Sequence, residues 1–278
     1  MSRFILAVSG GVDSVVLMEM FDWPEDTIVA HFDHGIRPSS SDDCAFVRHL
    51  AERHGWSFVF ERAALGASCS EELARRRRYD FLFRTASKYR AELVTAHHAD
   101  DCIETIAINL LRGTGWRGLS PLSNPRVFRP MLQLFKSDIY RFAAEKQLIF
   151  RLDQTNNDTQ YLRNRLRERL RSLSTAQKQQ LLALYHAQLS LKTDIEQALQ
   201  GIVGTRNYLP RRLFNAEIDD ARCEILRFFL ASHGIALTRP QTEHCLAEIV
   251  KFTPGKKYSL DKTHFLQADR QNYRIVEK

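Results

Sequence analysis

The sequence predicts an α/β protein, with a doubly wound, mostly parallel sheet followed by a helical segment and a small α+β module. The first 150 residues alternate short β-branched or aromatic runs with longer helical patterns, which is typical of βαβ units. From about Asp153 the pattern is mostly helical, and after residue 210 short alternating segments return beside two helices. A chain of 278 residues has room for about two domains, which we place at residues 1–200 and 201–278.

The sheet should contain five runs rich in β-branched and aromatic residues: Phe4–Val8, Thr27–Phe32, Ser57–Glu61, Glu92–Ala96 and Arg126–Phe128. Five segments have helical spacing of apolar residues: Asp13–Phe21, Ser41–His54, Ser70–Lys88, Asp100–Leu111 and Ser137–Lys146. Ligands of doubly wound sheets bind outside the carboxyl ends of the strands. Polar clusters follow the first, second and fourth runs, at Ser9–Ser14, Asp33–Arg37 and His97–Asp101. We therefore expect these three loops to converge on one edge.

The second half is expected to begin with an arginine-rich helical segment, Arg163–Arg171, and a helix over Leu181–Leu199. Gly201–Pro210 holds two glycines, an asparagine and a proline, and is the best candidate for a linker. The α+β module should then contain two helices, near Asp219–Ser232 and Pro240–Lys251. Alternating, strand-like segments are expected at Lys257–Leu260 and Tyr273–Val276.

The formal net charge of +7 is concentrated in one segment. Between Thr159 and Leu213, ten Lys or Arg residues stand against three acids, which leaves 30 against 30 in the rest of the chain. Five of the ten are arginines of Arg163–Arg171, and the guanidinium group is suited to planar recognition of phosphate. A basic helix is often only a solvated face, but beside a nucleotide-binding fold this excess favours nucleic-acid binding.

The five cysteines are odd in number and far apart, without a CxxC pair or a metal-ligand spacing. This pattern predicts a reducing compartment and no zinc or iron-sulfur site. The first apolar run is too short for a signal peptide, and no stretch is long and apolar enough to span a membrane. We therefore expect a cytoplasmic protein with no membrane partner.

The loop SGGVDS, Ser9–Ser14, lies between an expected strand and an expected helix. Adjacent glycines let backbone N–H groups surround an anion at the positive end of the helix. The loop is neither a Walker sequence nor a GxGxxG fingerprint, and the first lysine of the chain is Lys88. Such a loop suits attack on the α-phosphate of ATP, with pyrophosphate leaving. We assign ATP binding to six residues: Ser9, Gly10, Gly11, Val12, Asp13 and Ser14. Asp13 is expected either to hold Mg²⁺ or to cap the helix.

A second cluster, TAHHADDCIET, runs from Thr95 to Thr105. Asp101 and Glu104 are three residues apart and share a helix face, where two carboxylates either cap the helix or bind the ammonium group of a substrate. His97 and His98 are candidates for phosphate contact or proton transfer.

Several motifs together resemble a known family. They are SGGVDS, HFDHGIRPSSSDD, ELARRRRYDFL, TAHHADDCIET, LLRGTGWRGLSPL, RPML and DQTNNDTQYLRNRLR. In this order they are similar to the tRNA(Ile)-lysidine synthetases of the PP-loop ATP pyrophosphatase superfamily. The resemblance covers roughly residues 4–170 and, more weakly, the chain from Arg222 onward.

The resemblance implies ligation of free lysine to the wobble cytidine of an isoleucine tRNA with the anticodon CAU. Carbon 2 of the base is activated by adenylation, and the lysine ε-amine then displaces AMP. ATP and Mg²⁺ would be required. Asp101 and Glu104 would hold lysine, and His97 would lie near the nucleotide. The expected catalytic residues are Asp13, His97, Asp101 and Glu104. The expected tRNA-binding residues are arginines of two segments: Arg75, Arg76, Arg77, Arg78, Arg163, Arg165 and Arg167.

Two alternative enzymes share the loop. A PP-loop tRNA thiolase would use catalytic cysteines or an iron-sulfur cluster, and only Cys102 lies beside the expected site. An amidotransferase of the NAD or GMP synthetase kind would not need the arginine segment. The general base, the oligomeric state (a homodimer included) and the tRNA nucleotides that are read stay open.

Overall fold

The computed structural model describes residues 3–35, 40–63, 69–151, 162–216 and 219–277, without the side chains of a few helical residues at the edges of these ranges. The chain forms two compact units, Met1–Tyr185 and His186–Lys278. The division falls inside one helix, α7 (Thr175–Val203). The domain boundary expected after residue 200 lies in the same helix and stays a prediction.

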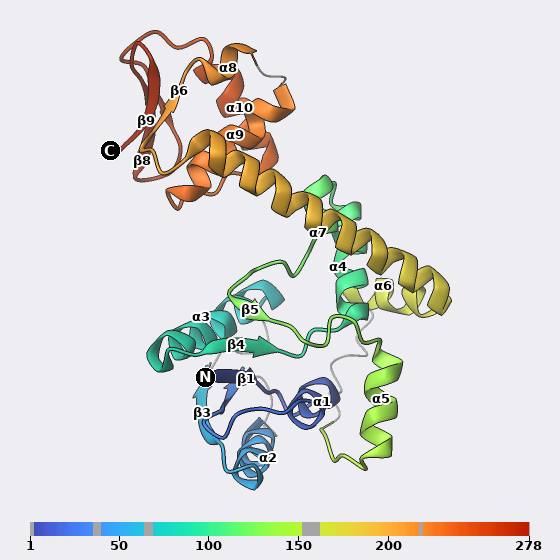
Figure 1. The fold of residues 1–278 in the computed structure, drawn as a ribbon. Coiled ribbons are helices and arrows are strands. Elements are labelled where there is room, and N and C mark those ends of the chain that lie inside the picture. Colours follow the sequence, from blue (N-terminus) through green and yellow to red (C-terminus); the bar gives the residue numbers. More distant parts are fainter. Residues whose placement is uncertain (1–2, 36–39, 64–68, 152–161, 217–218, 278) are drawn as a thin grey trace. The chain divides into compact units, whose positions relative to one another are not determined.

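The N-terminal unit is built on a five-stranded parallel sheet with the order β3-β2-β1-β4-β5 (Figure 1). Its strands are β1 (Phe4–Ala7), β2 (Ile28–Asp33), β3 (Ser57–Arg62), β4 (Glu92–Thr95) and β5 (Val127–Phe128). β1 pairs with β2 on one side and with β4 on the other, so the strand order reverses between β1 and β4. In the β1–β4 pair Ala7 lies opposite Thr95, so both strands end at the same level. The loops that follow them therefore begin side by side.

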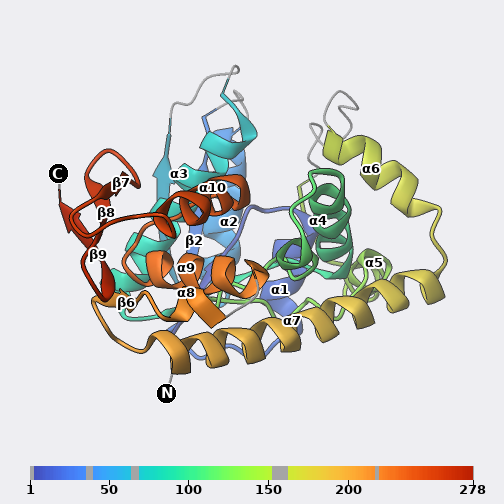
Figure 2. The same ribbon diagram turned by 90° about the horizontal axis from the view of Figure 1, so that it is seen from above.

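Helices cover both faces of this sheet. They are α1 (Val12–Met20), α2 (Ser40–Arg53), α3 (Glu71–Tyr89), α4 (Ala99–Leu111) and α5 (Lys136–Glu145), with a short 3₁₀ turn, η1 (Trp116–Leu119). Leu6 of β1 packs with α1, α2 and α5, whereas Ile5 packs with α3 on the opposite face (Figures 1 and 2). Every residue of β2 is buried, as expected for a central parallel strand covered on both faces.

The predicted α/β class and doubly wound sheet are confirmed. All five strands and all five helices expected in the first 150 residues are present, each within one residue of the expected ends. A further helix, α6 (Leu162–Arg171), coincides with the arginine-rich segment and packs against α4.

The C-terminal unit is a small α+β module, as expected. Its antiparallel sheet has the order β6-β9-β8-β7, formed by β6 (Tyr208–Pro210), β7 (Lys257–Ser259), β8 (His264–Ala268) and β9 (Asn272–Glu277). Its helices after α7 are α8 (Leu213–Ala216), α9 (Asp219–Ser232) and α10 (Arg239–Ile249). Phe229 and Leu266 are fully buried in its core, and the Tyr273 hydroxyl donates to the Ile249 carbonyl at 2.9 Å. The sequence did not predict β6, β8 or α8, because these elements are too short for a periodic pattern.

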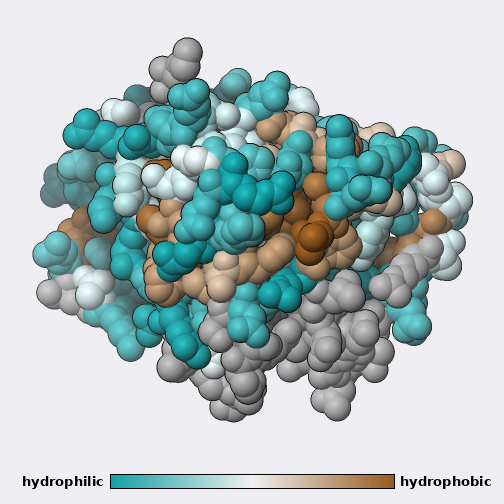
Figure 3. All heavy atoms as spheres, turned by 90° about the horizontal axis from the view of Figure 1, so that it is seen from below, coloured by the Kyte–Doolittle hydropathy of each residue, from teal (hydrophilic) through white to brown (hydrophobic). Residues whose placement is uncertain are grey.

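The surface is mainly polar. On the face drawn in Figure 3, hydrophilic side chains cover most of the area and hydrophobic residues gather around its middle. In the described part of the chain, none of the helices combines the length and apolarity needed to cross a membrane.

Gly10, in the loop after β1, has a backbone that only glycine adopts easily, with φ of +90°. A Cβ there would lie 3.3 Å from Val47 and 3.4 Å from Phe46, both on α2. Gly55 also has a positive φ, +72°, but a Cβ there would meet nothing within 4 Å. The loop therefore needs glycine at position 10 for both its dihedral angle and its space.

We predict that Gly10→Ala lowers the free energy of unfolding more than Gly55→Ala. The control should lose about 1 kcal/mol, the cost of a left-handed backbone for a residue with a Cβ. Gly10→Ala carries this cost and must also push the Val47 and Phe46 side chains aside by a few tenths of an ångström. Denaturant unfolding of both variants measures the difference, and equal losses would show that close packing on the loop is unimportant.

Candidate active site

The loop Ser9–Ser14 is held in shape by its own last residue. The hydroxyl of Ser14 accepts hydrogen bonds from the backbone N–H of Ser9 at 3.2 Å and of Gly10 at 3.1 Å, and donates to the Gly11 carbonyl at 2.9 Å. From the other side, the Arg151 N–H donates to the Gly10 carbonyl at 2.9 Å. These hydrogen bonds hold the loop from both sides.

Helix α1 begins directly after this loop. Gly11 is its N-cap and makes no side-chain cap bond, so the first N–H groups of the helix face the loop. A helix start of this kind attracts anions, phosphate in particular. Asp13 lies in the first turn of α1 but does not cap it. The alternative that Asp13 serves as the cap is therefore wrong, and its carboxylate is used elsewhere.

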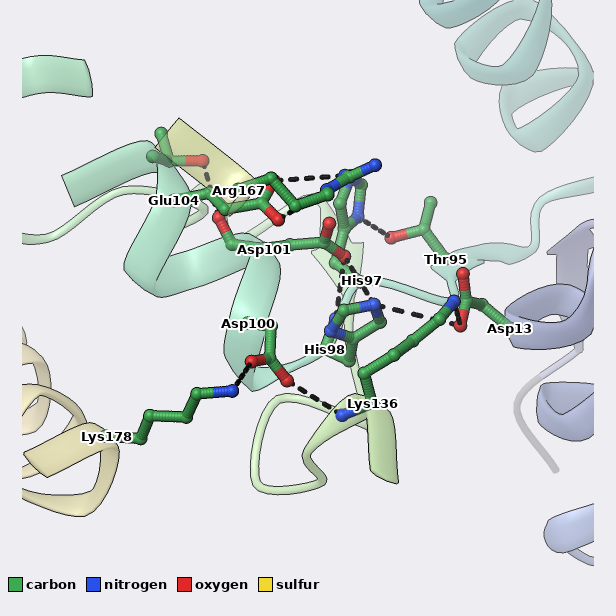
Figure 4. A network of polar contacts seen from close by, with 11 residues as sticks. Asp13, Thr95, His97, His98, Asp100, Asp101, Glu104, Lys136, Arg167 and Lys178 are labelled. Carbon is green, nitrogen blue, oxygen red and sulfur yellow. Dashed lines mark hydrogen bonds and ion pairs between the residues drawn. The ribbon is translucent and has the colours of Figure 1, made fainter. Parts of the chain in front are cut away.

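Asp13 meets the residues that follow β4 (Figure 4). The Nε2 atom of buried His98 lies 3.7 Å from the Asp13 carboxylate and 3.5 Å from that of Asp101. Asp101 Oδ2 also accepts from the His98 N–H at 3.1 Å, which caps α4. The capping alternative for Asp101 is thus confirmed, and the same carboxylate faces the site. The structure brings together the loops after β1 and β4, two of the three loops that the sequence predicted to converge.

The loop Ser9–Ser14 contains no lysine, but a lysine of α5 reaches it. Lys136, at the start of α5, places its Nζ 2.5 Å from the Asp13 carboxylate. Sequence reasoning missed this residue, because 123 positions separate it from Asp13 and no local pattern links them. The Lys136 side chain is about one-third exposed, and its ammonium group lies beside the first turn of α1 through the contact with Asp13.

Asp100, the neighbour of Asp101, ties three helices together. Its Oδ1 accepts from Lys178 Nζ of α7 at 2.6 Å, and its Oδ2 accepts from the Lys136 N–H of α5 at 2.7 Å. Both side chains of the Asp100–Lys178 pair are at most one-fifth exposed. Asp100 therefore has a structural role, which leaves Asp101 and Glu104 as the carboxylates of α4 at the site.

Glu104 is bound by an arginine from α6. Arg167 Nε donates to Oε1 at 2.6 Å and Nη2 donates to Oε2 at 3.0 Å (Figure 4). The Glu104 side chain is only 5 % exposed. The hydrogen bond to Glu104 raises the pKa of Arg167 above its ordinary value, so the guanidinium group keeps its charge. Two residues predicted to bind different ligands, lysine and tRNA, thus bind each other.

His97 is neutral in this environment. Its Nδ1 lies 2.7 Å from the Thr95 hydroxyl, which fixes the ring. Burial lowers the pKa of His97 to about 3, with Arg129, Arg75 and Arg78 acting in the same direction and Asp101 opposing them. His97 near pH 7 therefore offers one N–H donor and one acceptor, and is not a cationic proton donor.

Of the four arginines of α3, Arg75 and Arg78 lie close enough to act electrostatically on His97. Arg75, Arg76 and Arg77 are exposed, and the guanidinium groups of Arg75 and Arg78 lie 5.2 and 5.6 Å from the centre of the Tyr79 ring. Arg163 and Arg165 belong to α6, but their side chains lie outside the described part, as does Arg37 entirely.

Arg129, from the RPML motif, was missed as a site residue. It is held by hydrogen bonds from Nη1 to the Val127 and Asn124 carbonyls at 2.9 and 3.2 Å. Burial lowers its pKa, and its charge acts on His97. It adds a fixed cation to the region between α3 and α4.

Cys102 has no features of a reactive thiol. It is fully buried in α4, and burial raises its pKa to about 12. A thiol in this state is protonated, whereas nucleophilic cysteines are thiolates. Within the described ranges, no three His, Cys, Asp or Glu side chains are grouped as a metal or cluster site would require.

A family model described as the PP-loop domain matches residues 1–173. The chain belongs to this family. Membership implies ATP binding, in agreement with the diglycine loop.

Two curated relatives are the tRNA(Ile)-lysidine synthases of Thermotoga sp. (strain RQ2) and Nostoc sp. (strain PCC 7120 / SAG 25.82 / UTEX 2576). The first is 37 % identical over 182 residues, covering 60 % of this chain and 44 % of the relative. The second is 37 % identical over 181 residues, covering 60 % and 53 %.

The resemblance found in the motifs is confirmed by these relatives, and the chain spans about half their length. Among solved structures, the U34-tRNA thiolase of Methanococcus maripaludis, with its 4Fe-4S cluster, is similar in fold. The TM-score is 0.58 at 16 % identity, over 68 % of this chain and 72 % of that one. At this identity the similarity establishes the PP-loop fold alone.

We predict that His97 makes folding sensitive to acid. Its pKa is about 3 in the folded chain and near 6.5 when unfolded, so between these values the unfolded state binds more protons. This contribution to the free energy of unfolding is complete above pH 6.5 and is lost as pH falls toward 3, by at most about 1.4 kcal/mol per pH unit. His97→Gln removes it.

The measurement is denaturant unfolding at pH 7.0 and 4.5 for the wild type, His97→Gln and the control His49→Gln, whose side chain is exposed. His97→Gln should lose less stability on acidification than the other two. Parallel losses in all three proteins would contradict the buried, neutral state of His97.

Proposed function

We propose that this protein ligates free lysine to carbon 2 of the wobble cytidine in an isoleucine tRNA with the anticodon CAU, using ATP. The observation that carries the proposal is that Asp13 of the loop Ser9–Ser14 and Asp101 of α4 both lie beside the His98 ring at the switch point of a PP-loop sheet, with Glu104 three residues further along α4. A phosphate-binding loop would then lie beside a site for a cationic amino acid. The names of the relatives support the same reaction.

In the first step the cytidine oxygen on carbon 2 attacks the α-phosphate, and pyrophosphate leaves. The N–H groups at the start of α1 would bind phosphate oxygens, and Lys136 would supply the cation that a Walker loop carries itself. His97, neutral and hydrogen-bonded to Thr95, would contact the nucleotide without repelling a cationic substrate.

In the second step the lysine ε-amine attacks carbon 2, and AMP leaves with the former base oxygen. Asp101 and Glu104 bind and orient the side-chain ammonium group. The ammonium group must lose a proton before its nitrogen can act as a nucleophile. Until then the two carboxylates would hold it in a fixed orientation, partly removed from water.

Asp13 fits Mg²⁺ as a ligand. Mg²⁺ is commonly bound by one or two carboxylates together with substrate phosphates, so a single carboxylate beside the loop is sufficient. When bound, the ion would neutralise charge on the phosphates. Lys136 now occupies this carboxylate and would share it with the ion or move to the phosphates.

For tRNA we propose the arginines of α3 and α6, namely Arg75, Arg76, Arg77, Arg78, Arg163, Arg165 and Arg167, with further contacts from the C-terminal module. The charge excess of the segment containing α6 supports this assignment. A cytoplasmic location and the lysine and tRNA partners belong to the same proposal. The thiolase alternative finds no support in Cys102, whose thiol is buried and protonated.

The direct test is incubation with ATP, radioactive lysine and an isoleucine tRNA bearing CAU, with methionine tRNA of the same anticodon as the comparison. Label should enter the isoleucine tRNA alone. Incorporation of radioactive sulfur from a sulfur donor, with no lysine incorporated, would support the thiolase instead.

We predict that Asp101→Asn lowers kcat/KM for lysine about 10- to 100-fold, since it removes one charge-assisted contact worth about 1.5–3 kcal/mol. Asparagine keeps an oxygen that accepts from the His98 N–H, so α4 stays capped and ATP binding should be unchanged. Asp138→Asn is the matched control, because Asp138 caps α5 in the same way, accepting from the Phe135 N–H at 3.0 Å. Equal activity of the two variants would refute the role of Asp101.

We further predict that Lys136→Ala raises KM for ATP about tenfold, the effect of losing roughly 1.4 kcal/mol of phosphate binding. The exposed Lys146, at the other end of α5, provides the control Lys146→Ala. Steady-state kinetics at varied ATP measures both. If Lys136→Ala kept the KM of the control, its ammonium group would serve only to neutralise Asp13.

A further inference from the structure

Arg167 of α6 binds Glu104 of α4 through two hydrogen bonds. The guanidinium group binds both carboxylate oxygens, at 2.6 and 3.0 Å, and its own side chain is 28 % exposed. It comes from α6, which packs on α4 (Figure 2). A fork of two parallel hydrogen bonds to a nearly buried carboxylate is a strong, oriented interaction.

This geometry conflicts with a simple lysine site. The proposed substrate brings an ammonium group to Glu104, but a permanent cation already lies there, and two cations at one carboxylate repel each other. Arg167 thus occupies the place of the substrate's charge. Because Arg167 belongs to the basic helix α6, phosphates of a bound tRNA offer it an alternative anionic partner.

We propose that Arg167 determines the order of substrate binding, by occupying the lysine subsite at Glu104 until tRNA phosphates draw its guanidinium group away. This inference rests on the proposed function and deepens it. Lysine then binds tightly only to the complex with tRNA, because Glu104 becomes available to it after the tRNA has bound.

The inference has a thermodynamic consequence. If tRNA frees Glu104, it raises the affinity for lysine, and lysine must raise the affinity for tRNA by the same factor. A subsite that is open in about one-tenth of free molecules has an apparent Kd about tenfold above its intrinsic value. Removing Arg167 opens the subsite without tRNA and abolishes the coupling.

The experiment is equilibrium dialysis of labelled lysine against the wild type, Arg167→Gln and Arg169→Gln, each with and without an isoleucine tRNA transcript bearing CAU. Arg169 lies on the same helix, and its side chain is exposed, so its variant loses the same charge without touching Glu104. For the wild type and Arg169→Gln, tRNA should lower the Kd for lysine about tenfold. For Arg167→Gln the Kd should be low in both conditions.

A thermal-unfolding measurement keeps the test decisive if Arg167→Gln is less stable. Loss of the guanidinium group leaves a buried carboxylate without this partner, so the variant should melt earlier and regain stability when free lysine is added. Lysine should change the Tm of the wild type much less in the absence of tRNA.

Three results would overturn the inference. Weaker lysine binding by Arg167→Gln than by the control would show that Arg167 only positions Glu104 for lysine. Coupling to tRNA that persists in Arg167→Gln would place the coupling elsewhere. Absence of lysine binding in all three proteins, with and without tRNA, would instead refute the proposed function and this inference with it.

Discussion

The site depends on one feature of the sheet, the parallel pairing of β1 with β4. Because Ala7 lies opposite Thr95, the two strands end together, and their neighbours continue in opposite directions across the sheet. The segment after β1 leads to α1 and the segment after β4 leads to α4. No connection crosses between these two strands, so a crevice forms between the two loops. The phosphate loop and the start of α4 face each other for this reason.

Charge neutralisation organises the residues at this edge. Asp13 is bound by Lys136, Asp100 by Lys178 and Glu104 by Arg167, each through a contact of 2.5–2.6 Å. The buried or half-buried carboxylates would be costly if they were unpaired, so the protein supplies a cation for each from a different helix. Under the proposed function, binding of ATP and an amino acid at this site would exchange ionic partners. The cations that leave the carboxylates would then become available for phosphates.

Local features of the site were predictable from the sequence. The strands and helices expected in the first 150 residues were accurate because β-branched runs and 3.6-residue periodicity are local patterns in a layered fold. The loop Ser9–Ser14 and the capping of α4 by Asp101 follow from residues within a few positions of each other. The convergence of the loops followed from a general rule of parallel sheets.

The partners from distant segments were not predictable. Lys136 and Arg167 reach the site from 123 and 63 positions away, and no spacing rule connects a lysine of α5 with a carboxylate of α1. The lowered pKa of His97 likewise depends on burial and on Arg129, which are properties of the assembled fold. The sequence indicated candidate side chains for the chemistry, but only the structure showed which of them contact one another.

The central claim is that the loop after β1 binds ATP so that the α-phosphate is attacked. The most direct measurement is separation of the nucleotide products formed from ATP labelled in the α- and γ-phosphates, with the isoleucine tRNA and lysine present. The account predicts labelled AMP and pyrophosphate in equal amounts. Labelled ADP and orthophosphate would contradict it.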